Sequence, residues 1–416
     1  MLEDLAKKIP PRKHIEIICY GIVSGTPFAV LYTALVVWLK EEGHALAVVT
    51  TIAASRLPYS FKFVWSPLVD SIKIPYLYKL GRRRSWMIVS IILMTLVMCT
   101  LGFTDAKNDF NIIYTLALIL GFAAATFDIA FDAFRIDSFE SHEQGIAVAN
   151  AILGFRIGAA FVSSVGLYLS TLVRWEGVFC IIAIIFAVSV TYVPFLKEPN
   201  YQDIKTQNFV ERIKISAIAP FTEFLTRKNA LLILLGVVLY KVGDVLLGFI
   251  STPFYLELGY TKTQVAAIAK FFGLIATLVG TYIGGAIIKK VGNISGLIIC
   301  GILMSIVNLS YIWLHYMPIE SIYLFITICI ENIGCATGSV ALAAYLSSLC
   351  NKNYSATQYA LFTSFAAFAN STISIKAGSL VDFIGWDYFF FSTVVISIPS
   401  LLIFWYIEKC NKKNNI

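Results

Sequence analysis

Three ionisable residues stand deep inside long apolar stretches of this 416-residue chain: Arg56, Asp128 and Arg156. An ionised side chain near the centre of a bilayer costs at least ~2.5 to 3.5 kcal/mol, so such residues are expected to face a cavity or a partner. At ~1.5 Å of rise per helical residue, each lies ~12 to 17 Å from the inner end of its predicted span, close to the midplane. Two arginines and one carboxylate at similar depth could hold an anion beside a titratable group. A permanent structural ion pair is the alternative.

A stripe of charged residues continues along the helix that carries Asp128. Steps of four and three residues place Asp128, Asp132 and Arg135 on one helical face. Asp132 and Arg135 then lie near the predicted cytoplasmic mouth, where we expect them to form a gate latch with Asp70 and Lys62. This latch is a more natural role for them than substrate binding.

The second half of the chain carries its own intramembrane charges. Lys241 and Asp244 are three residues apart, so they either neutralise one another or serve a ligand. Glu331 is a lone carboxylate in an apolar stretch, and burial favours its protonated form. That property suits proton carriage, although a partnered structural role is the alternative. Tyr59 could stack on a sugar ring, whereas packing is the commoner role of an aromatic residue in a span.

The composition indicates that the helices that carry these residues cross a membrane. Hydrophobic residues make up 58% of the chain, charged residues 14%, and mean hydropathy is +0.79, whereas soluble chains are roughly a quarter charged. A span needs a run of roughly 20 apolar residues. We therefore predict an all-α membrane protein with about twelve spans, at 15–39, 45–66, 85–103, 112–135, 145–172, 178–196, 229–256, 264–288, 294–315, 322–346, 356–380 and 388–408.

The net charge of +7 is explained by topology and not by nucleic acid. With the N-terminus inside, 22 of the 32 basic residues fall in cytoplasmic segments, four fall outside and six lie within spans. An excess of Lys and Arg is typical of the cytoplasmic loops of membrane proteins. Both termini are expected in the cytoplasm, and no nucleic-acid partner is expected.

The chain divides into two halves. Its longest polar stretch forms a cytoplasmic linker at 197–228, between six-span halves at 1–196 and 229–416. A basic loop follows the second span of each half, at 70–84 and 284–292, which indicates an internal duplication. Two such halves around a midplane site are typical of major-facilitator transporters. The Arg82–Arg84 cluster in the first loop fits that superfamily's signature, or else a simple stop-transfer signal. Asp137, two residues after Arg135, is expected to be solvated.

Eight cysteines occur singly, without the paired spacing of a zinc or redox site. Histidine occurs only four times and shows no metal-ligand spacing. We therefore expect no metal, no cofactor and no enzymatic activity. A membrane enzyme acting on lipid-linked sugars remains a remote alternative.

Short sequence motifs occur along nearly the whole chain. They are Ser-Gly-Thr-Pro-Phe at 24–28 and the segments 57–70, 81–86, 128–135, 154–158, 240–244, 270–274, 331–332, 349–352, 356–361 and 385–386. Read together, they resemble the AmpG muropeptide permease family within the major facilitator superfamily. Two positions depart from the family pattern, because Phe127 stands where a glutamine is frequent and Asn370 where a basic residue is frequent.

The resemblance implies a monomeric, multi-pass permease of the cell inner membrane. Its substrates would be anhydromuropeptides, N-acetylglucosaminyl-anhydro-N-acetylmuramyl peptides, imported by proton symport and alternating access for cell-wall recycling. Such anionic glycopeptides carry carboxylates that basic residues can neutralise. A carrier of another organic anion, such as acetyl-coenzyme A, is the alternative, because those carriers are distant relatives of the family.

We expect the candidate residues to serve three roles. Those expected to bind substrate are Arg56, Tyr59, Lys62, Arg156 and Lys241. Those expected to couple transport to protons are Asp128, Asp244 and Glu331, and those expected to act in gating are Asp70, Asp132 and Arg135.

Overall fold

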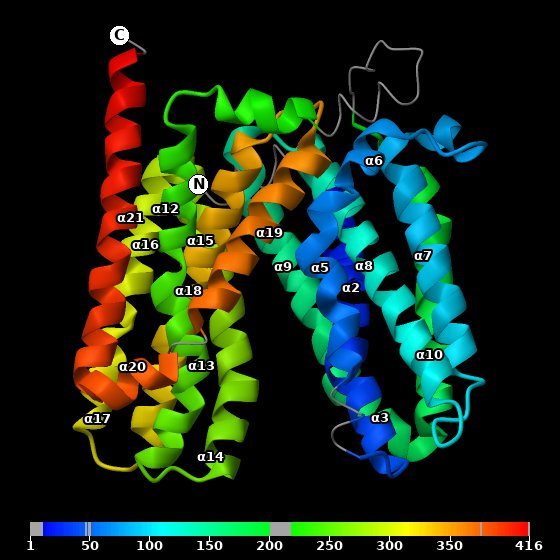
Figure 1. The fold of residues 1–416 in the computed structure, drawn as a ribbon, viewed down its shortest axis with the longest axis horizontal. Coiled ribbons are helices and arrows are strands. Elements are labelled where there is room, and N and C mark those ends of the chain that lie inside the picture. The colour runs from blue at the N-terminus through cyan, green and yellow to red at the C-terminus, as the bar shows by residue number, and fades with distance from the viewer. Residues whose placement is uncertain (1–10, 46–47, 49–50, 200–217, 375–376, 415–416) are drawn as a thin grey trace. The chain divides into compact units, whose positions relative to one another are not determined.

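The computed structural model describes residues 11–414 except 46–47, 49–50, 200–217 and 375–376. Within that part of the chain every regular element is a helix. The chain divides into two compact units (Figure 1). Most of the predicted linker at 197–228 lies outside the described residues, and the division of the chain into sequence halves stays a prediction.

The first unit comprises Met1–Phe139, Asn150–Phe221 and Cys350–Ser364. Its helices α7, α8 and α10 pack side by side, and α2 packs on α8. Its elements are α2 (Pro11–Ala29), η1 (Val30–Ala34), α3 (Leu35–Glu41), η2 (Ile52–Arg56), α5 (Leu57–Phe61), η3 (Lys62–Val64), α6 (Ser66–Ser71), η4 (Leu77–Leu80), α7 (Arg82–Leu101), α8 (Phe110–Ser138), η6 (Phe161–Gly166), α10 (Leu167–Tyr192), η7 (Val193–Phe195) and parts of α9 (Gln144–Ala160) and α19 (Ser355–Ser374).

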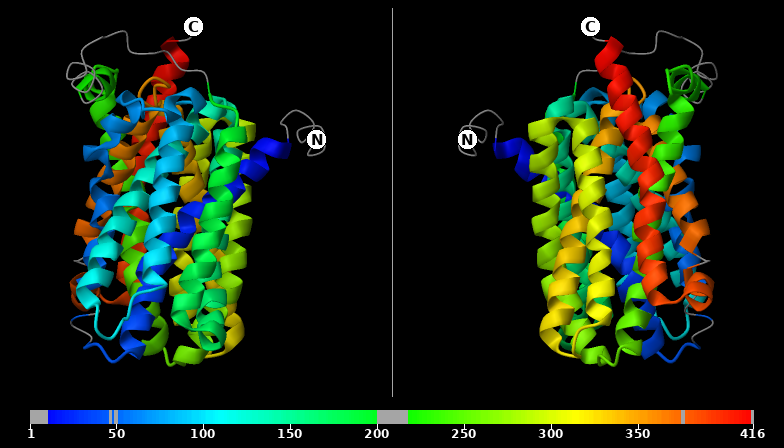
Figure 2. Two further views of the ribbon diagram at one scale, coloured as in Figure 1. Left: turned by 90° about the vertical axis from the view of Figure 1, so that its right-hand side faces the viewer. Right: turned by 90° about the vertical axis from the view of Figure 1, so that its left-hand side faces the viewer.

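The second unit comprises Glu140–Ala149, Thr222–Leu349 and Phe365–Ile416. Helix α18 packs against α15 and α16, and the long helix α21, red in Figure 2, packs against α12 and α16. Its elements are η5 (Ser141–Glu143), α12 (Ala230–Tyr240), α13 (Val242–Glu257), α14 (Lys262–Ala267), η8 (Ile268–Phe272), α15 (Gly273–Val291), α16 (Asn293–Val307), α17 (Leu309–His315), α18 (Ser321–Leu349), α20 (Ala377–Ile384), α21 (Trp386–Asn414) and the remaining parts of α9 and α19.

The predicted second span is a chain of short helices. Between Ile52 and Ser71 the structure contains η2, α5, η3 and α6, and prolines stand in the first turns of α5 and α6. Proline lacks a backbone N–H and is favoured at the first turn of a helix, so Pro58 and Pro67 each restart the helix. The resulting turns bring Arg56, Tyr59 and Lys62 onto separate short elements of one span.

The first span is continuous through its proline. A proline inside a helix removes a backbone hydrogen bond and commonly kinks or ends the helix, but α2 runs through Pro27 to Ala29. A π-helical turn, η1, follows it. We attribute this continuity to widening of the helix after Pro27, because a π turn accommodates a disturbed hydrogen-bond ladder without ending the helix.

Glycines set the closest helix contacts in both units. A β-carbon at Gly154 or Gly158 of α9 would overlap backbone atoms of α2. A β-carbon at Gly280 or Gly284 of α15 would likewise meet the backbone of α18. These contacts confirm the close packing that small residues at four-residue spacing predict.

Nine helical stretches of the described residues are long and apolar enough to cross a membrane. One of them, Ser141–Phe195, holds two expected spans, which the left-handed backbone of Arg174 (φ 57°) separates. The expected span at 45–66 is the broken chain of short helices, and that at 356–380 corresponds to α19 and α20. All expected spans are therefore accounted for.

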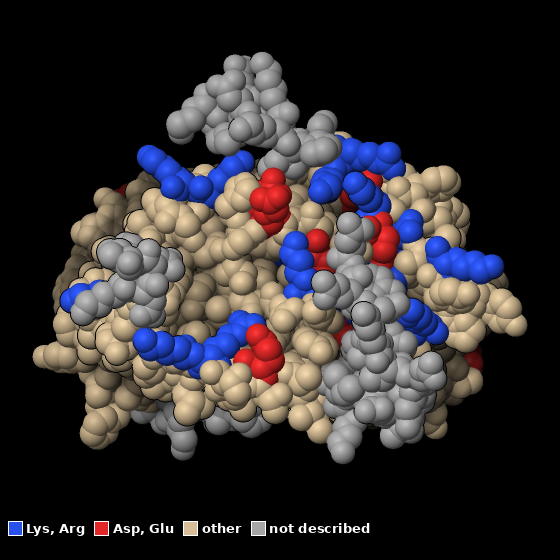
Figure 3. All heavy atoms as spheres, turned by 90° about the horizontal axis from the view of Figure 1, so that it is seen from above, with Lys and Arg blue, Asp and Glu red and all other residues tan. Residues whose placement is uncertain are grey.

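Charged side chains gather where these helices end. The end of the molecule seen in Figure 3 carries Lys and Arg side chains interspersed with Asp and Glu. In the first unit, this is the end at which α6 stops and α7 begins.

Candidate functional site

In the first unit, Asp128 of α8 accepts a hydrogen bond from the hydroxyl of Ser24 on α2, with 2.6 Å between Oγ and Oδ1. Lys62 of η3 is only 9% exposed and lies within electrostatic reach of this carboxylate. Among the described residues, neither Asp128 nor Lys62 forms a direct ion pair. Asp128 is therefore a half-buried carboxylate beside a hydroxyl and a nearby cation, and it can exchange a proton without breaking a salt bridge.

Arg56 lies on an aromatic cluster in the same unit. Its guanidinium carbon is 3.5 Å from the ring centroid of Tyr32, and Phe28 stacks on Tyr32 with 4.0 Å between ring centroids. Tyr59 meets Phe28 edge-on, and its buried hydroxyl has no hydrogen-bond partner within the described part of the chain. A guanidinium beside exposed aromatic faces can bind an anion and an adjacent sugar ring together.

Arg156 is exposed, and its guanidinium forms no hydrogen bond or ion pair with any described residue. Its neighbour Phe155 packs against Phe28, at 5.3 Å between ring centroids. Of the three residues expected at one depth, Arg56, Asp128 and Arg156, none is paired with another in the described structure. The alternative of a permanent ion pair among them is therefore not observed, and Arg156 is available to an anion.

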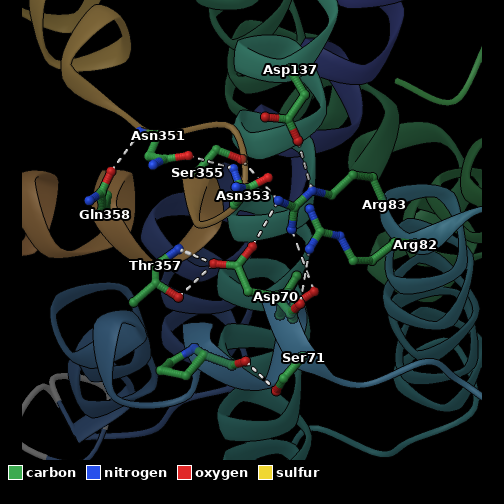
Figure 4. Close-up of polar contacts among 12 residues, drawn as sticks. Asp70, Ser71, Arg82, Arg83, Asp137, Asn351, Asn353, Ser355, Thr357 and Gln358 are labelled. Carbon is green, nitrogen blue, oxygen red and sulfur yellow. Dashed lines mark hydrogen bonds and ion pairs between the residues drawn. The ribbon is translucent and has the colours of Figure 1, made fainter. Parts of the chain in front are cut away.

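A buried ionic cluster lies where α6 ends and α7 begins (Figure 4). We call it the Asp70 cluster, and its members are Asp70, Arg83, Asp137, Ser355 and Thr357. Arg83 pairs with Asp70 at 2.8 Å and with Asp137 at 3.1 Å, and it also donates to the Ser355 hydroxyl at 2.9 Å. The other Asp70 oxygen accepts bonds from the backbone N–H and the hydroxyl of Thr357, at 2.8 and 2.6 Å. The first turn of α19 is thereby bonded to α6 and α7.

The predicted gate latch is distributed differently. Asp132 pairs with Arg135 at 3.3 Å, and the Arg135 guanidinium lies over the Tyr359 ring at 5.3 Å. Asp70 is bonded in the Asp70 cluster instead, and Lys62 lies near Asp128. The four expected members thus do not form one latch. Asp132 and Arg135 are paired, but no hydrogen bond or ion pair among the described residues joins them to Asp70 or Lys62.

The expectation that Asp137 is solvated was wrong. Its side chain is 3% exposed, because Arg83 lies between it and Asp70 and neutralises both carboxylates. Sequence reasoning also left Arg83 without a site role, although the Gly-Arg-Arg-Arg signature marked its position.

In the second unit, the Lys241 ammonium donates to Asp244 and, at 2.9 Å, to the Ser339 hydroxyl. The expected mutual neutralisation of Lys241 and Asp244 is therefore present. Glu331 is not alone, because Cys335 donates to one of its oxygens at 3.4 Å and Asn332 to the other at 2.9 Å. Cys335 lies one helical turn from Glu331, so its spacing could have revealed it.

The ligand atoms of Asp244, Glu331 and Cys335 lie within 4.8 Å of one another. Because Lys241 already neutralises Asp244, the positive charge of a metal ion would be opposed at this place. The donor set therefore suits hydrogen bonding and proton exchange better than metal binding. The side chain of Asn370, the second departure from the family pattern, lies outside the described residues.

The sequence profile of the Major Facilitator Superfamily matches residues 17–374. The chain is 45% identical over 404 residues to the transporter AmpG 4 of Rickettsia conorii, covering 96% of this chain and 97% of that protein. It is 31% identical over 396 residues to the anhydromuropeptide permease of Escherichia coli K12, covering 94% and 79% of the two chains.

Solved structures agree on the fold. The fucose:proton symporter of E. coli superimposes with a TM-score of 0.71 at 11% identity, over 95% of this chain and 98% of that one. The proton:xylose symporter XylE gives 0.64 at 12% identity, over 94% of both chains. The protein is therefore a multi-pass secondary transporter and not an enzyme, and it belongs to the AmpG-type permease family of the major facilitator superfamily.

Proposed function

We propose that this transporter imports anhydromuropeptides into the cytoplasm by proton symport, so that cell-wall fragments are recycled. The named activity of the E. coli relative supports this cargo. The observation that carries the proposal is the Asp128 site, a half-buried carboxylate bonded to Ser24, with Lys62 nearby and without an ion-pair partner among the described residues.

The Asp128 site supplies a physical route to coupling. A serine hydroxyl can donate to an ionised carboxylate and can accept from a protonated one, so Ser24 serves both states of Asp128. Lys62 favours the ionised state, because opposite charges attract across a poorly solvated interior. An anion bound near Lys62 would oppose that field and favour protonation. Substrate and proton would then bind with positive, reciprocal coupling.

Substrate contacts follow from the side chains that remain available. Arg156 is exposed without a described partner, and Arg56 presents its guanidinium over Tyr32. Peptide carboxylates fit these cations, and a sugar ring fits the aromatic face of Tyr59. Lys241 is already bonded to Asp244, so it would bind a carboxylate only by exchanging partners.

Gating and placement complete the proposal. Asp70, Asp132 and Arg135 act at the cytoplasmic end, where release of Asp70 from Thr357 would free the first turn of α19.

The excess of basic residues in the loops assigned to the cytoplasm supports both termini lying inside. The protein acts as a monomer in the cell inner membrane, with the two sequence halves as its moving parts, and Asp244 and Glu331 take part in proton transfer in the second unit.

Proteoliposomes loaded at neutral pH and diluted into acid buffer test the proposal. Radiolabelled anhydromuropeptide should accumulate above its external concentration, and a protonophore should abolish accumulation. Acetyl-coenzyme A added outside should not compete, whereas unlabelled anhydromuropeptide should. Accumulation that ignores the protonophore would refute proton coupling, and competition by acetyl-coenzyme A alone would refute the cargo.

A further inference from the structure

A pocket of about 370 Å³ opens at one end of the second unit. Its walls come from the start of α12, the junction of α15 and α16, and the final turns of α18 and α21. Ligand sites typically occupy roughly 300 to 1,000 Å³. None of the residues that line the pocket has been assigned to transport above.

One wall is the first turn of α16, a helix of 15 residues. The first N–H groups of an α-helix have no partner inside the helix, and they carry the positive end of its dipole. Gly292 precedes this helix with a left-handed backbone (φ 89°) and supplies no capping side chain. Asn293, Ile294 and Ser295, the first three residues of this helix, line the pocket. This is the arrangement that favours an anion.

A second, independent feature points to a ligand. Tyr345 lines the pocket and is only 2% exposed, yet its hydroxyl has no hydrogen-bond partner among the described residues. Its ring is held edge-on against Phe404, at 5.3 Å between ring centroids. Although the ring is buried, the hydroxyl oxygen is not sealed from solvent, so a ligand in the pocket can replace water as its hydrogen-bond partner. Tyr345 is therefore a ready hydrogen-bond donor.

The charge around the pocket favours an anion. Lys228 lines it directly, and Lys289 and Lys290 stand in the last turn of α15 beside it. The nearby acid is Glu408, which accepts a hydrogen bond from the Ser295 hydroxyl at 2.6 Å. Among the described residues that line the pocket, the one charged side chain is that of Lys228, which is positive.

We propose that this pocket binds a phosphate group. A phosphate can accept bonds from several N–H donors at a helix N-terminus, from the Tyr345 hydroxyl and from the Lys228 ammonium together. The phosphate belongs to the headgroup of an anionic phospholipid or to a free phosphate ion. In the expected topology these helix ends lie at the cytoplasmic surface, the level of lipid headgroups, where basic pockets between spans bind such lipids.

Two binding measurements on the purified full-length protein test this proposal and separate the two sources. Equilibrium dialysis with ³²P-labelled inorganic phosphate measures the free ion. Native mass spectrometry after incubation with equal amounts of phosphatidylglycerol and phosphatidylcholine measures the lipid. Binding of inorganic phosphate supports a soluble ligand, and selective retention of phosphatidylglycerol alone supports the headgroup.

Two substitutions locate the bound phosphate. Lys228→Gln removes a charge-assisted bond and should weaken binding roughly tenfold, and Tyr345→Phe removes a neutral one and should weaken it roughly fivefold. Tyr345→Phe keeps the ring against Phe404, so it preserves the fold. Lys107→Gln and Tyr388→Phe change exposed residues away from the pocket and serve as matched controls. Absence of binding by both probes, or equal binding by Lys228→Gln, Tyr345→Phe and the controls, would overturn the proposal.

Discussion

The intramembrane charges of the two units are arranged in different ways. In the first unit, Asp128 is bonded to a neutral hydroxyl, and its nearest cation, Lys62, stays at a distance. In the second unit, Lys241 is bonded directly to Asp244. An ion pair in low dielectric holds both charges in place, because breaking it leaves an uncompensated charge. The comparison teaches that Asp128 can change its protonation state without breaking an ion pair, whereas Asp244 can do so only when Lys241 releases it.

The largest effect is expected at the carboxylate that can change. Asp128→Asn keeps the size of the side chain and its contact with Ser24 but cannot release a proton. We expect substrate binding to persist and proton-driven accumulation to be lost completely, leaving only equilibration of the substrate. Uptake against a concentration gradient in proteoliposomes measures this. Normal accumulation by the variant would remove Asp128 from the coupling mechanism.

A large loss of stability is expected at the Asp70 cluster. Arg83→Met leaves two buried carboxylates, Asp70 and Asp137, without their cation, and breaking a buried pair costs about 3 to 5 kcal/mol. The matched control is Arg174→Gln, because the Arg174 side chain is 79% exposed and its pair with Glu176 is worth about 0 to 1 kcal/mol. Thermal unfolding in detergent compares the two variants. Equal shifts would show that the Asp70 cluster contributes no special stability.

The direct pair of the second unit is tested by a double substitution. Lys241→Met alone should destabilise the protein by about 3 to 5 kcal/mol, because Asp244 is left uncompensated. Adding Asp244→Asn should recover most of that loss, since a neutral pair needs no counter-charge. Unfolding of the single and double variants measures the coupling. A double variant as unstable as the single one would contradict a pair that is mainly structural.

The smallest effect is expected at Arg156. Because its guanidinium has no described partner in the protein, Arg156→Gln should leave unfolding unchanged. It should raise the KM for anhydromuropeptide roughly tenfold, since one charge-assisted bond to the substrate is lost. Arg156→Lys retains the charge and should recover part of the affinity. A KM unchanged in Arg156→Gln would exclude this residue from substrate binding.

The sequence predicted what depends on local pattern. Apolar runs located the spans. Helical spacing offered the Lys241 and Asp244 pair as one of two alternatives, and it would also have predicted the contact between Glu331 and Cys335. Each of these two pairs joins residues at most four positions apart.

Partners from different helices could not be predicted in this way. Ser24 and Asp128 are separated by 104 positions, Arg83 and Asp137 by 54, and Asp70 and Thr357 by 287. Such contacts depend on how each helix is rotated against its neighbour. Close packing at glycines fixes that rotation, and one apolar pattern is compatible with several rotations. The burial of Asp137 was missed for this reason.

The π turn at Val30–Ala34 has a consequence for how such spans change during evolution. A π turn holds one residue more in each hydrogen-bonded ring than an α turn does, and adding a residue to an α-helix rotates everything beyond it by about 100°. The wide turn takes up the extra residue. Ser24 before it and Trp38 after it therefore point in the same directions as in an α-helix that lacks the extra residue. Homologous chains can therefore gain or lose one residue here while every neighbour of the span is retained, and an alignment gap within Val30–Ala34 would record an insertion that left the packing intact.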